Sequence, residues 1–183
     1  MTVHDHQHDS GLDGLALSAT LHCLTGCAIG EIAGMVVGTA LGLPNAATVG
    51  ISIALAFLFG YLLTSLPLLR AGLALAVLAP IAFASDTASI ALMELVDNAI
   101  IVAVPGAIDA GLGDILFWGS LAFALFVAGL CAFPLNRFLI RRGKGHAAVH
   151  QTGIHGGPPT RVVAAITVLA GLFGGIVLLI EAF

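Results

Sequence analysis

The chain has 183 residues, of which 59% are hydrophobic and 9% are charged, and its formal net charge is −4. A soluble domain carries about 25% charged residues, so this composition excludes a water-soluble globular protein and favours a membrane protein. The six Lys and Arg residues are too few for a phosphate-binding face, which excludes a nucleic-acid-binding protein.

Apolar stretches predict an all-α, polytopic helical membrane bundle of about five transmembrane helices. The first stretch covers about residues 15–41 and ends at a Gly-Leu-Pro-Asn turn signal, and the second covers about residues 46–69. The third, residues 71–104, is too long for one upright span, so we expect a shallow helix to Pro80, a bend, and then the true span. The fourth and fifth stretches cover about residues 115–140 and 162–179.

The basic residues orient these spans. With five crossings and a cytoplasmic N-terminus, every Lys and Arg falls on the cytoplasmic side or at its interface, as the positive-inside rule requires. The predicted organisation is a His-bearing cytoplasmic tail (1–14), a four-helix membrane core (15–142), a cytoplasmic loop (143–160) and a fifth transmembrane helix (161–183). In the tail, His4, His6 and His8 are candidates for accessory metal capture, and simple solvation is the alternative.

The first span carries two rows of residues at four-residue spacing. One row is a run of overlapping GxxxG steps, which predicts the close approach of another helix. The other row places two thiols, a carboxylate and a thioether on one helical face, because residues four apart lie above one another. This row and the histidine beside its start are His22, Cys23, Cys27, Glu31 and Met35. Cysteine and methionine are ordinary apolar fillers, but a carboxylate inside a bilayer is costly and indicates function.

The third span adds the acidic residues Asp86, Glu94 and Asp97, with Met93 among them. No Lys or Arg lies deep within any predicted span. The acids must therefore be protonated, hydrated, hydrogen-bonded or bound to a cation. A cation route or proton relay explains them, and protonated acids that only bridge helices are the alternative.

Residue counting predicts how the two spans face each other. Counted back from the outer ends, Cys27 lies at the depth of Ser89 and Glu31 at the depth of Met93. Met35 falls near Asp97 by the same count. Counted from the cytoplasmic end of the fourth span, Cys131 falls near His22 and Cys23, which suggests a soft site for Cu(I) or Zn(II).

Three segments, HCLTGCAIGEIAGM from His22, SDTASIALMELVDNAI from Ser85 and FPLNRFLIRRGKGHA from Phe133, carry a family resemblance. Over roughly residues 18–150 the chain resembles a family of small bacterial integral membrane proteins catalogued as a domain of unknown function. The resemblance implies a multi-pass protein of the bacterial inner membrane, and it implies no activity.

The favoured hypothesis is transport or handling of a transition-metal ion across that membrane, with copper preferred and zinc second. The candidate ligands are His22, Cys23, Cys27, Glu31, Met35, Met93, Glu94 and Asp97, with Asp86 as a proton relay. The alternatives are an intramembrane thiol redox enzyme that uses Cys23 and Cys27, and a non-catalytic assembly subunit. A transporter is favoured over an enzyme, and a homo-oligomer in the lipid bilayer is expected.

Overall fold

The computed structural model describes residues 3–70, 72, 74–143 and 160–182, and side chains from residue 11 onward except at positions 67, 75, 78, 81 and 85. Within these residues the chain is helical and has no strand. The elements are α1 (Val3–Leu41), α2 (Asn45–Arg70), α3 (Leu75–Ala103), a short 3-10 helix η1 (Ala107–Asp109), α4 (Ile115–Arg141) and α6 (Thr160–Glu181). The predicted all-α class is confirmed.

Local sequence signals explain several helix ends. α1 stops at the predicted turn, where Gly42 has a φ of +61° and the Leu43 amide donates to the Gly38 carbonyl at 2.9 Å. This is the Schellman arrangement, which needs a left-handed residue and therefore favours glycine. α4 starts at Asp114, whose carboxylate accepts a hydrogen bond from the Leu116 amide at 3.0 Å, as an N-cap residue does.

Two helices differ from their predicted extents. α1 begins at Val3, so the helix covers most of the segment predicted as a tail. α3 is one continuous helix through Pro80, where we expected a shallow helix, a bend and a separate span. Pro80 lies in the second turn of α3, where a proline removes only one backbone hydrogen bond, and the helix continues past it.

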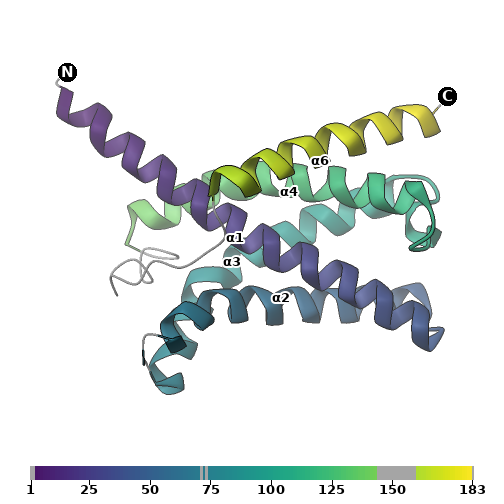
Figure 1. Cartoon of the computed structure of the whole chain (residues 1–183), viewed down its shortest axis with the longest axis horizontal. Helices are drawn as coiled ribbons and strands as arrows, with labels where there is room; N and C mark the ends of the chain where they lie inside the picture. Colours follow the sequence, from purple (N-terminus) through teal and green to yellow (C-terminus); the bar gives the residue numbers. More distant parts are fainter. Residues whose placement is uncertain (1–2, 71, 73, 144–159, 183) are drawn as a thin grey trace.

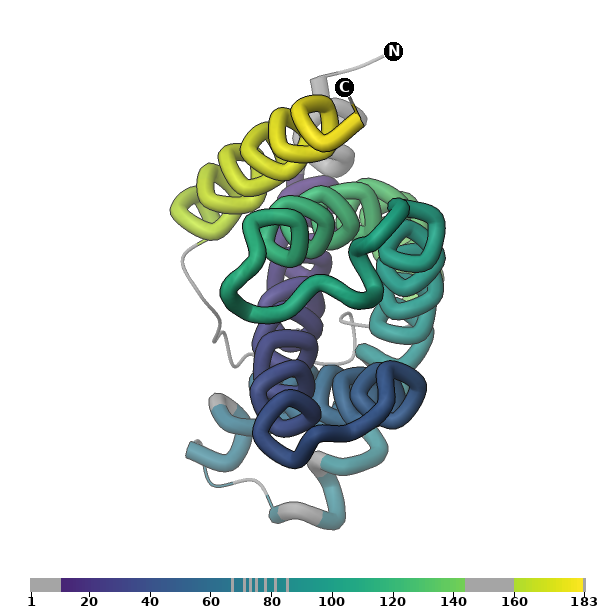
Figure 2. The backbone as a smooth tube through the Cα atoms, turned by 90° about the vertical axis from the view of Figure 1, so that its right-hand side faces the viewer, coloured from purple at the N-terminus to yellow at the C-terminus, as the bar shows by residue number. Residues whose placement is uncertain are grey.

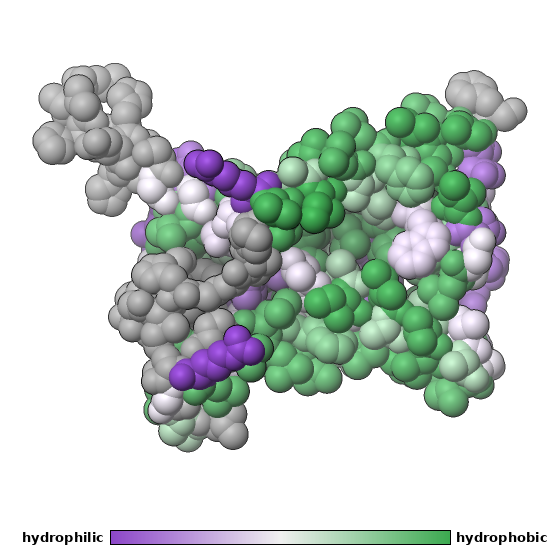
Figure 3. Space-filling view, in the orientation of Figure 1, coloured by the Kyte–Doolittle hydropathy of each residue, from purple (hydrophilic) through white to green (hydrophobic). Residues whose placement is uncertain are grey.

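Among the residues that the structure describes, four helices are long and apolar enough to cross a membrane: α1 over Gly11–Leu41, α2, α4 and α6. α3 is not one of these four, and it carries Asp86, Glu94 and Asp97. The face shown in Figure 3 is apolar over its middle, and hydrophilic residues gather toward the two ends of the molecule. These features agree with the predicted multi-pass membrane protein.

The helices α1 to α4 form a closed ring. α1 packs on α2, α2 on α3, α3 on α4 and α4 on α1, while α6 lies outside the ring, mainly against α4 (Figure 2). All of these helices run along the long axis, and successive helices alternate in direction (Figure 1). The side chains that face the inside of the ring therefore come from four different helices.

The glycine row of α1 packs against α2. A Cβ atom added at Gly30 would lie 2.2 Å from the Ala56 backbone nitrogen, and one at Gly26 would lie 2.7 Å from the Gly60 Cα. Gly34 meets Ser52 in the same way, so each step of four up α1 corresponds to a step of four down α2. The predicted close helix contact is therefore internal to the chain.

α6 also packs closely against its neighbour, α4, through glycine residues. A Cβ atom added at Gly171 or Gly174 would clash with Phe126 or with the backbone of α4. The rest of α6 is largely exposed and apolar, as Leu169 and Ile180 illustrate, which suits contact with lipid.

Candidate functional site

The acids of α1 and α3 meet inside the ring. Glu94 interacts with the carboxyl group of Glu31 and with the thiol of Cys27. Asp97, one turn further along α3, also faces Glu31. We call Cys27, Glu31, Glu94 and Asp97 the acid cluster.

The acid cluster is withdrawn from the surface. Glu94 is 5% exposed and Asp97 is 2% exposed. Asn98 donates to the Glu94 backbone carbonyl at 2.9 Å and approaches its carboxylate at 3.5 Å. One carboxyl oxygen of Glu31 and one of Asp97 are buried and lack a hydrogen-bond partner among the residues that the structure describes. Since buried polar atoms normally have partners, these two oxygens mark a place where a proton, water or cation belongs.

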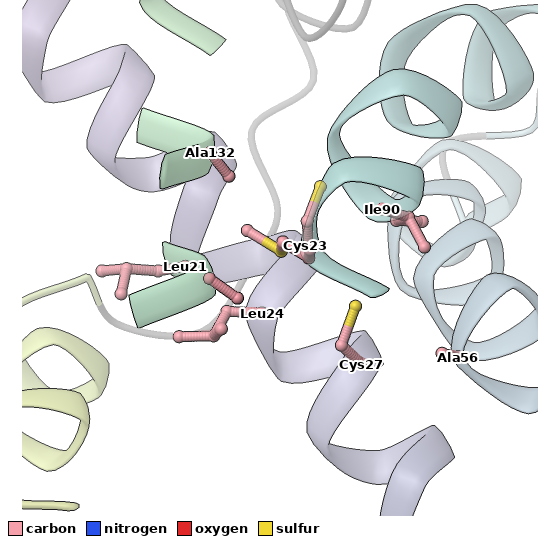
Figure 4. Packing of buried hydrophobic residues seen from close by; sticks show 9 residues of the cluster. Leu21, Cys23, Leu24, Cys27, Ala56, Ile90 and Ala132 are labelled. Carbon is pink, nitrogen blue, oxygen red and sulfur yellow. The ribbon is translucent and has the colours of Figure 1, made fainter. Parts of the chain in front are cut away.

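A second thiol and acid meet next to the cluster. The Cys23 thiol lies 3.9 Å from an Asp86 carboxyl oxygen, and both residues are fully buried. Cys23 and Cys27 lie on the same side of α1 and face α3 (Figure 4). Each thiol is therefore paired with a carboxyl group of α3.

Beyond Cys23, a buried hydrogen-bond node joins three helices. The Asn136 side chain of α4 donates to Thr20 of α1 at 2.9 Å and to Ser89 of α3 at 3.0 Å. These three residues are at most 3% exposed. We call them the Asn136 node.

His22 lies near this end of the row. Its Nε2 atom is 3.0 Å from the Thr64 hydroxyl of α2, and both side chains are buried. The interior polar groups therefore extend from the acid cluster to Cys23, Asp86 and the Asn136 node, which lie side by side, with His22 and Thr64 beside them.

A cavity of about 190 Å³ reaches the acid cluster from one end of the bundle. Its lining includes Glu31, Thr39, Thr48 and Ser52, and Asn45 and Asp109 from the loops at that end. The Asn45 amide donates to the Asp109 carboxylate at 2.7 Å. Among the lining residues none is Lys, Arg or His, so the cavity presents negative charge and neutral oxygen atoms.

The predicted facing of the two spans holds in direction and is displaced in register. α1 and α3 run in parallel, because Cys23, Cys27 and Glu31 meet successively later residues of α3. Glu31 interacts with Glu94, next to the predicted Met93, whereas Cys27 meets Glu94 instead of Ser89 and Asp97 faces Glu31 instead of Met35. Counting depth from the outer ends assumes that the helices are untilted and end at the same level. Because they are not, the predicted pairing of residues is displaced by up to about one helical turn.

The two candidate methionines lie in different parts of the bundle. Met93 is fully buried in the core with Cys23 and Cys27, whereas Met35 packs in a different cluster with Phe117 and Leu121 and lines the cavity.

The side chains of His4, His6 and His8 lie outside the described residues. Cys131 is exposed while Cys23 and Cys27 are buried, so the predicted third thiol of a soft site is wrong. Over the described part of the chain, no three His, Cys, Asp or Glu side chains are placed to hold a metal ion together.

Asn136 and Thr64 were not among the predicted site residues. Each is a polar residue in a largely apolar span with another polar residue beside it, Ser65 or Arg137, so the sequence does not single it out. Their partners Thr20, Ser89 and His22 are 42 or more positions away, so only the tertiary arrangement reveals the pairs.

A family model matches residues 14–145, and its description is "Domain of unknown function (DUF4396)". The matched segment contains α2, α3, α4 and most of α1, and thus every residue of the acid cluster and the Asn136 node. Neither a curated protein nor a solved structure gives a significant match to the chain.

Proposed function

This chain belongs to the DUF4396 family, and we propose that it is a proton-coupled transporter of a transition-metal ion in the bacterial inner membrane. The observation that carries the proposal is the acid cluster at the inner end of a cavity, in contact with a buried row of thiols and acids. An inert helix bundle gains nothing from such groups, because each costs free energy to bury.

The electrostatics favour an exchange of protons against a cation. The carboxyl groups of Glu31 and Glu94 are in contact, and no basic residue of the described chain joins them. Two carboxylates in contact repel strongly in a low-dielectric interior unless a proton or a cation lies between them. With no metal ion bound, a shared proton would relieve this repulsion. Arrival of the metal ion releases that proton and draws the ligands together.

The donor atoms bear on the cargo. Cys23 and Cys27 are the soft ligands that favour Cu(I), as the sequence predicts. Each of them is paired with a carboxyl group, Asp86 or Glu94, and such a mixed sulfur and oxygen set suits a borderline divalent ion such as Zn(II) equally well. Copper and zinc are therefore the two cargoes to test first.

The two alternative functions have less support. The glycine row that would dock a partner subunit is filled by α2. The Cys23 and Cys27 thiols face carboxyl groups of α3, whereas a dithiol redox site requires that the thiols face each other. A homo-oligomer stays a prediction, with the exposed apolar face of α6 as its candidate contact surface.

Five crossings with a cytoplasmic N-terminus are part of the proposal. Because the helices alternate in direction, Arg70, Arg141 and Arg161 lie at the same end of the bundle. Asp13 near the start of α1 forms an ion pair with Arg137 at that end. Asn45, Asp109 and Asp114 lie at the other end, so the positive-inside rule makes the basic end cytoplasmic.

Metal binding tests the proposal. The protein is purified under reducing conditions, its bound metals are measured by mass spectrometry, and its melting temperature is followed as Cu(I) or Zn(II) is added. We expect a metal-dependent rise in melting temperature that is lost in the Cys27→Ser, Glu31→Ala double variant. Cys131→Ser is the matched control, since Cys131 is exposed and away from the cluster, and it should keep the shift. A wild-type protein with neither bound metal nor a thermal shift would contradict the proposal.

A further inference from the structure

Among the residues that the structure describes, the cavity beside Glu31 is lined by one end of the bundle. It is bounded by the ends of α1, α2 and α3 and by the segment between α3 and α4, and its lining reaches from Asp109 to Glu31. None of the residues of the Asn136 node lines it.

The lining is chemically selective. It offers the carboxylates of Glu31 and Asp109, the hydroxyls of Thr39, Thr48 and Ser52, and the amides of Asn45 and Asn98. It has no cationic group that would attract an anion, and the rest of its lining is apolar apart from the Met35 thioether. Its volume of about 190 Å³ holds several water molecules, since each needs about 10–15 Å³ measured in this way. A hydrated cation is the species that fits this space and this charge.

An independent observation concerns the inner end of the cavity, where carboxyl oxygens can receive a cation. Asp97 is 2% exposed, and one of its carboxyl oxygens lacks a hydrogen-bond partner among the residues described. This side chain faces Glu31, which itself has one such oxygen and lines the cavity. Two buried acceptors without donors, at the end of an acidic cavity, are satisfied by a bound cation as well as by a proton or water.

In the opposite half of the row, the described side chains are tightly packed. Asn136, Thr20 and Ser89 are joined by short hydrogen bonds and are almost completely buried. Fully buried apolar side chains, Ile90 and Leu68, lie in the same half of α3 and α2. Buried side chains therefore occupy the described interior between the acid cluster and the Arg70 end.

We infer that the cavity is a vestibule that admits hydrated cations from the end that carries Asn45 and Asp109, and that the Asn136 node closes the other half in this conformation. The inference rests on the proposed function for the identity of the cargo. The charge selectivity of the cavity and the side from which it opens can be measured without transport. The vestibule and the proposed transport function can therefore fail independently.

Thiol labelling in sealed membrane vesicles tests the entry. Cysteine is introduced at Thr39, which lines the cavity, in a Cys131→Ser background. Gly113→Cys marks the same end of the bundle, because a side chain there meets nothing within 4 Å, and Arg142→Cys marks the opposite end. Rates are measured with membrane-impermeant methanethiosulfonates, one cationic and one anionic, and each rate is divided by that of the same reagent at Gly113→Cys.

Thr39→Cys should react from the Gly113 side, with the cationic reagent at least about 10-fold faster than the anionic one, because an acidic cleft concentrates cations. Adding Glu31→Gln and Asp109→Asn should bring the ratio close to one. Equal rates for the two reagents in the parent, or labelling only from the Arg142 side, would overturn the vestibule.

A buried position tests the closed half. Ser89→Cys should resist both reagents from both sides, and adding Asn136→Ala should expose it, raising its rate at least about 10-fold with the cationic reagent from the Arg142 side. The rate at Thr39→Cys reports that the variant has kept its fold. Rapid labelling of Ser89→Cys with Asn136 intact would contradict the closure, as would continued protection in the Asn136→Ala variant with an unchanged Thr39→Cys rate.

Discussion

At the scale of single residues, the polar groups of this protein divide into satisfied and unsatisfied ones. Asn136, Thr20, Ser89 and the pair of His22 with Thr64 have short hydrogen bonds, so they stabilise contacts between helices. Glu31 and Asp97 each keep a buried oxygen without a partner among the described residues. The satisfied groups suit a structural role, whereas the unsatisfied ones suit a ligand.

The satisfied groups give a prediction for stability. Asn136→Ala removes two buried hydrogen bonds and leaves the Ser89 and Thr20 hydroxyls without this donor, so the free energy of unfolding should fall by about 1–2 kcal/mol. Asn98→Ala is the control, since Asn98 bonds within its own helix and should cost less than about 1 kcal/mol. Unfolding in mixed micelles with increasing sodium dodecyl sulfate gives both values. A smaller loss for Asn136→Ala than for Asn98→Ala would show that the node does not hold the helices.

At the scale of helices, the contact between α1 and α2 decides how the acid cluster is assembled. Glycines on α1 let the two backbones approach closely, and the cluster faces α3 from the neighbouring row of the same helix. Without a hydrophobic driving force between helices in lipid, this tight packing supplies much of the association.

The prediction for this contact compares two glycines. At Gly30 an added Cβ would meet the Ala56 backbone at 2.2 Å, and since backbone atoms cannot turn aside, Gly30→Ala should destabilise the protein by about 2–3 kcal/mol. At Gly50 on α2 nothing lies within 4 Å, so Gly50→Ala should change the stability by less than about 0.5 kcal/mol. The same unfolding assay measures both. Equal effects of the two substitutions would mean that the helices do not pack as described.

The helices also show what a sequence can and cannot predict. Hydrophobic runs and the Gly42 turn predict the ends of α2 and α4 closely, because local chemistry decides them. The row of Cys23, Cys27 and Glu31 follows from helical spacing alone. Its pairing with α3 was displaced by up to about one turn, because tilt and loop geometry are not local properties. Cys131 was misplaced for a related reason, since depth in the bilayer says nothing about which side of α4 a residue occupies.

At the scale of the whole molecule, a ring of four helices encloses the polar row, and α6 covers one side of it. One end of the bundle carries Arg70, Arg141 and Arg161, and the other carries the mouth of the cavity. The proposed topology makes the basic end cytoplasmic.

Topology reporters test this orientation. An alkaline phosphatase or fluorescent protein joined after Phe183 should report the periplasm, and the same reporters inserted at Gly143 should report the cytoplasm, because α6 lies between the two positions. Insertion at Gly113, in the segment before α4, should report the periplasm. The opposite pattern at all three positions would invert the direction of the vestibule while leaving its structure intact.

The central claim is that the interior acids couple the movement of a metal ion to that of protons. Purified protein is reconstituted into liposomes that contain a pH-sensitive dye and a metal-sensitive dye, and Zn(II) or reduced copper is added outside. The account predicts metal entry with simultaneous proton efflux in the wild type, and at least about a 10-fold loss of both in Glu94→Gln. Glu181→Gln, at the end of α6 and away from the cluster, should behave as the wild type. Metal entry and proton flux no faster than in protein-free liposomes, or a Glu94→Gln variant as active as the wild type, would contradict the account.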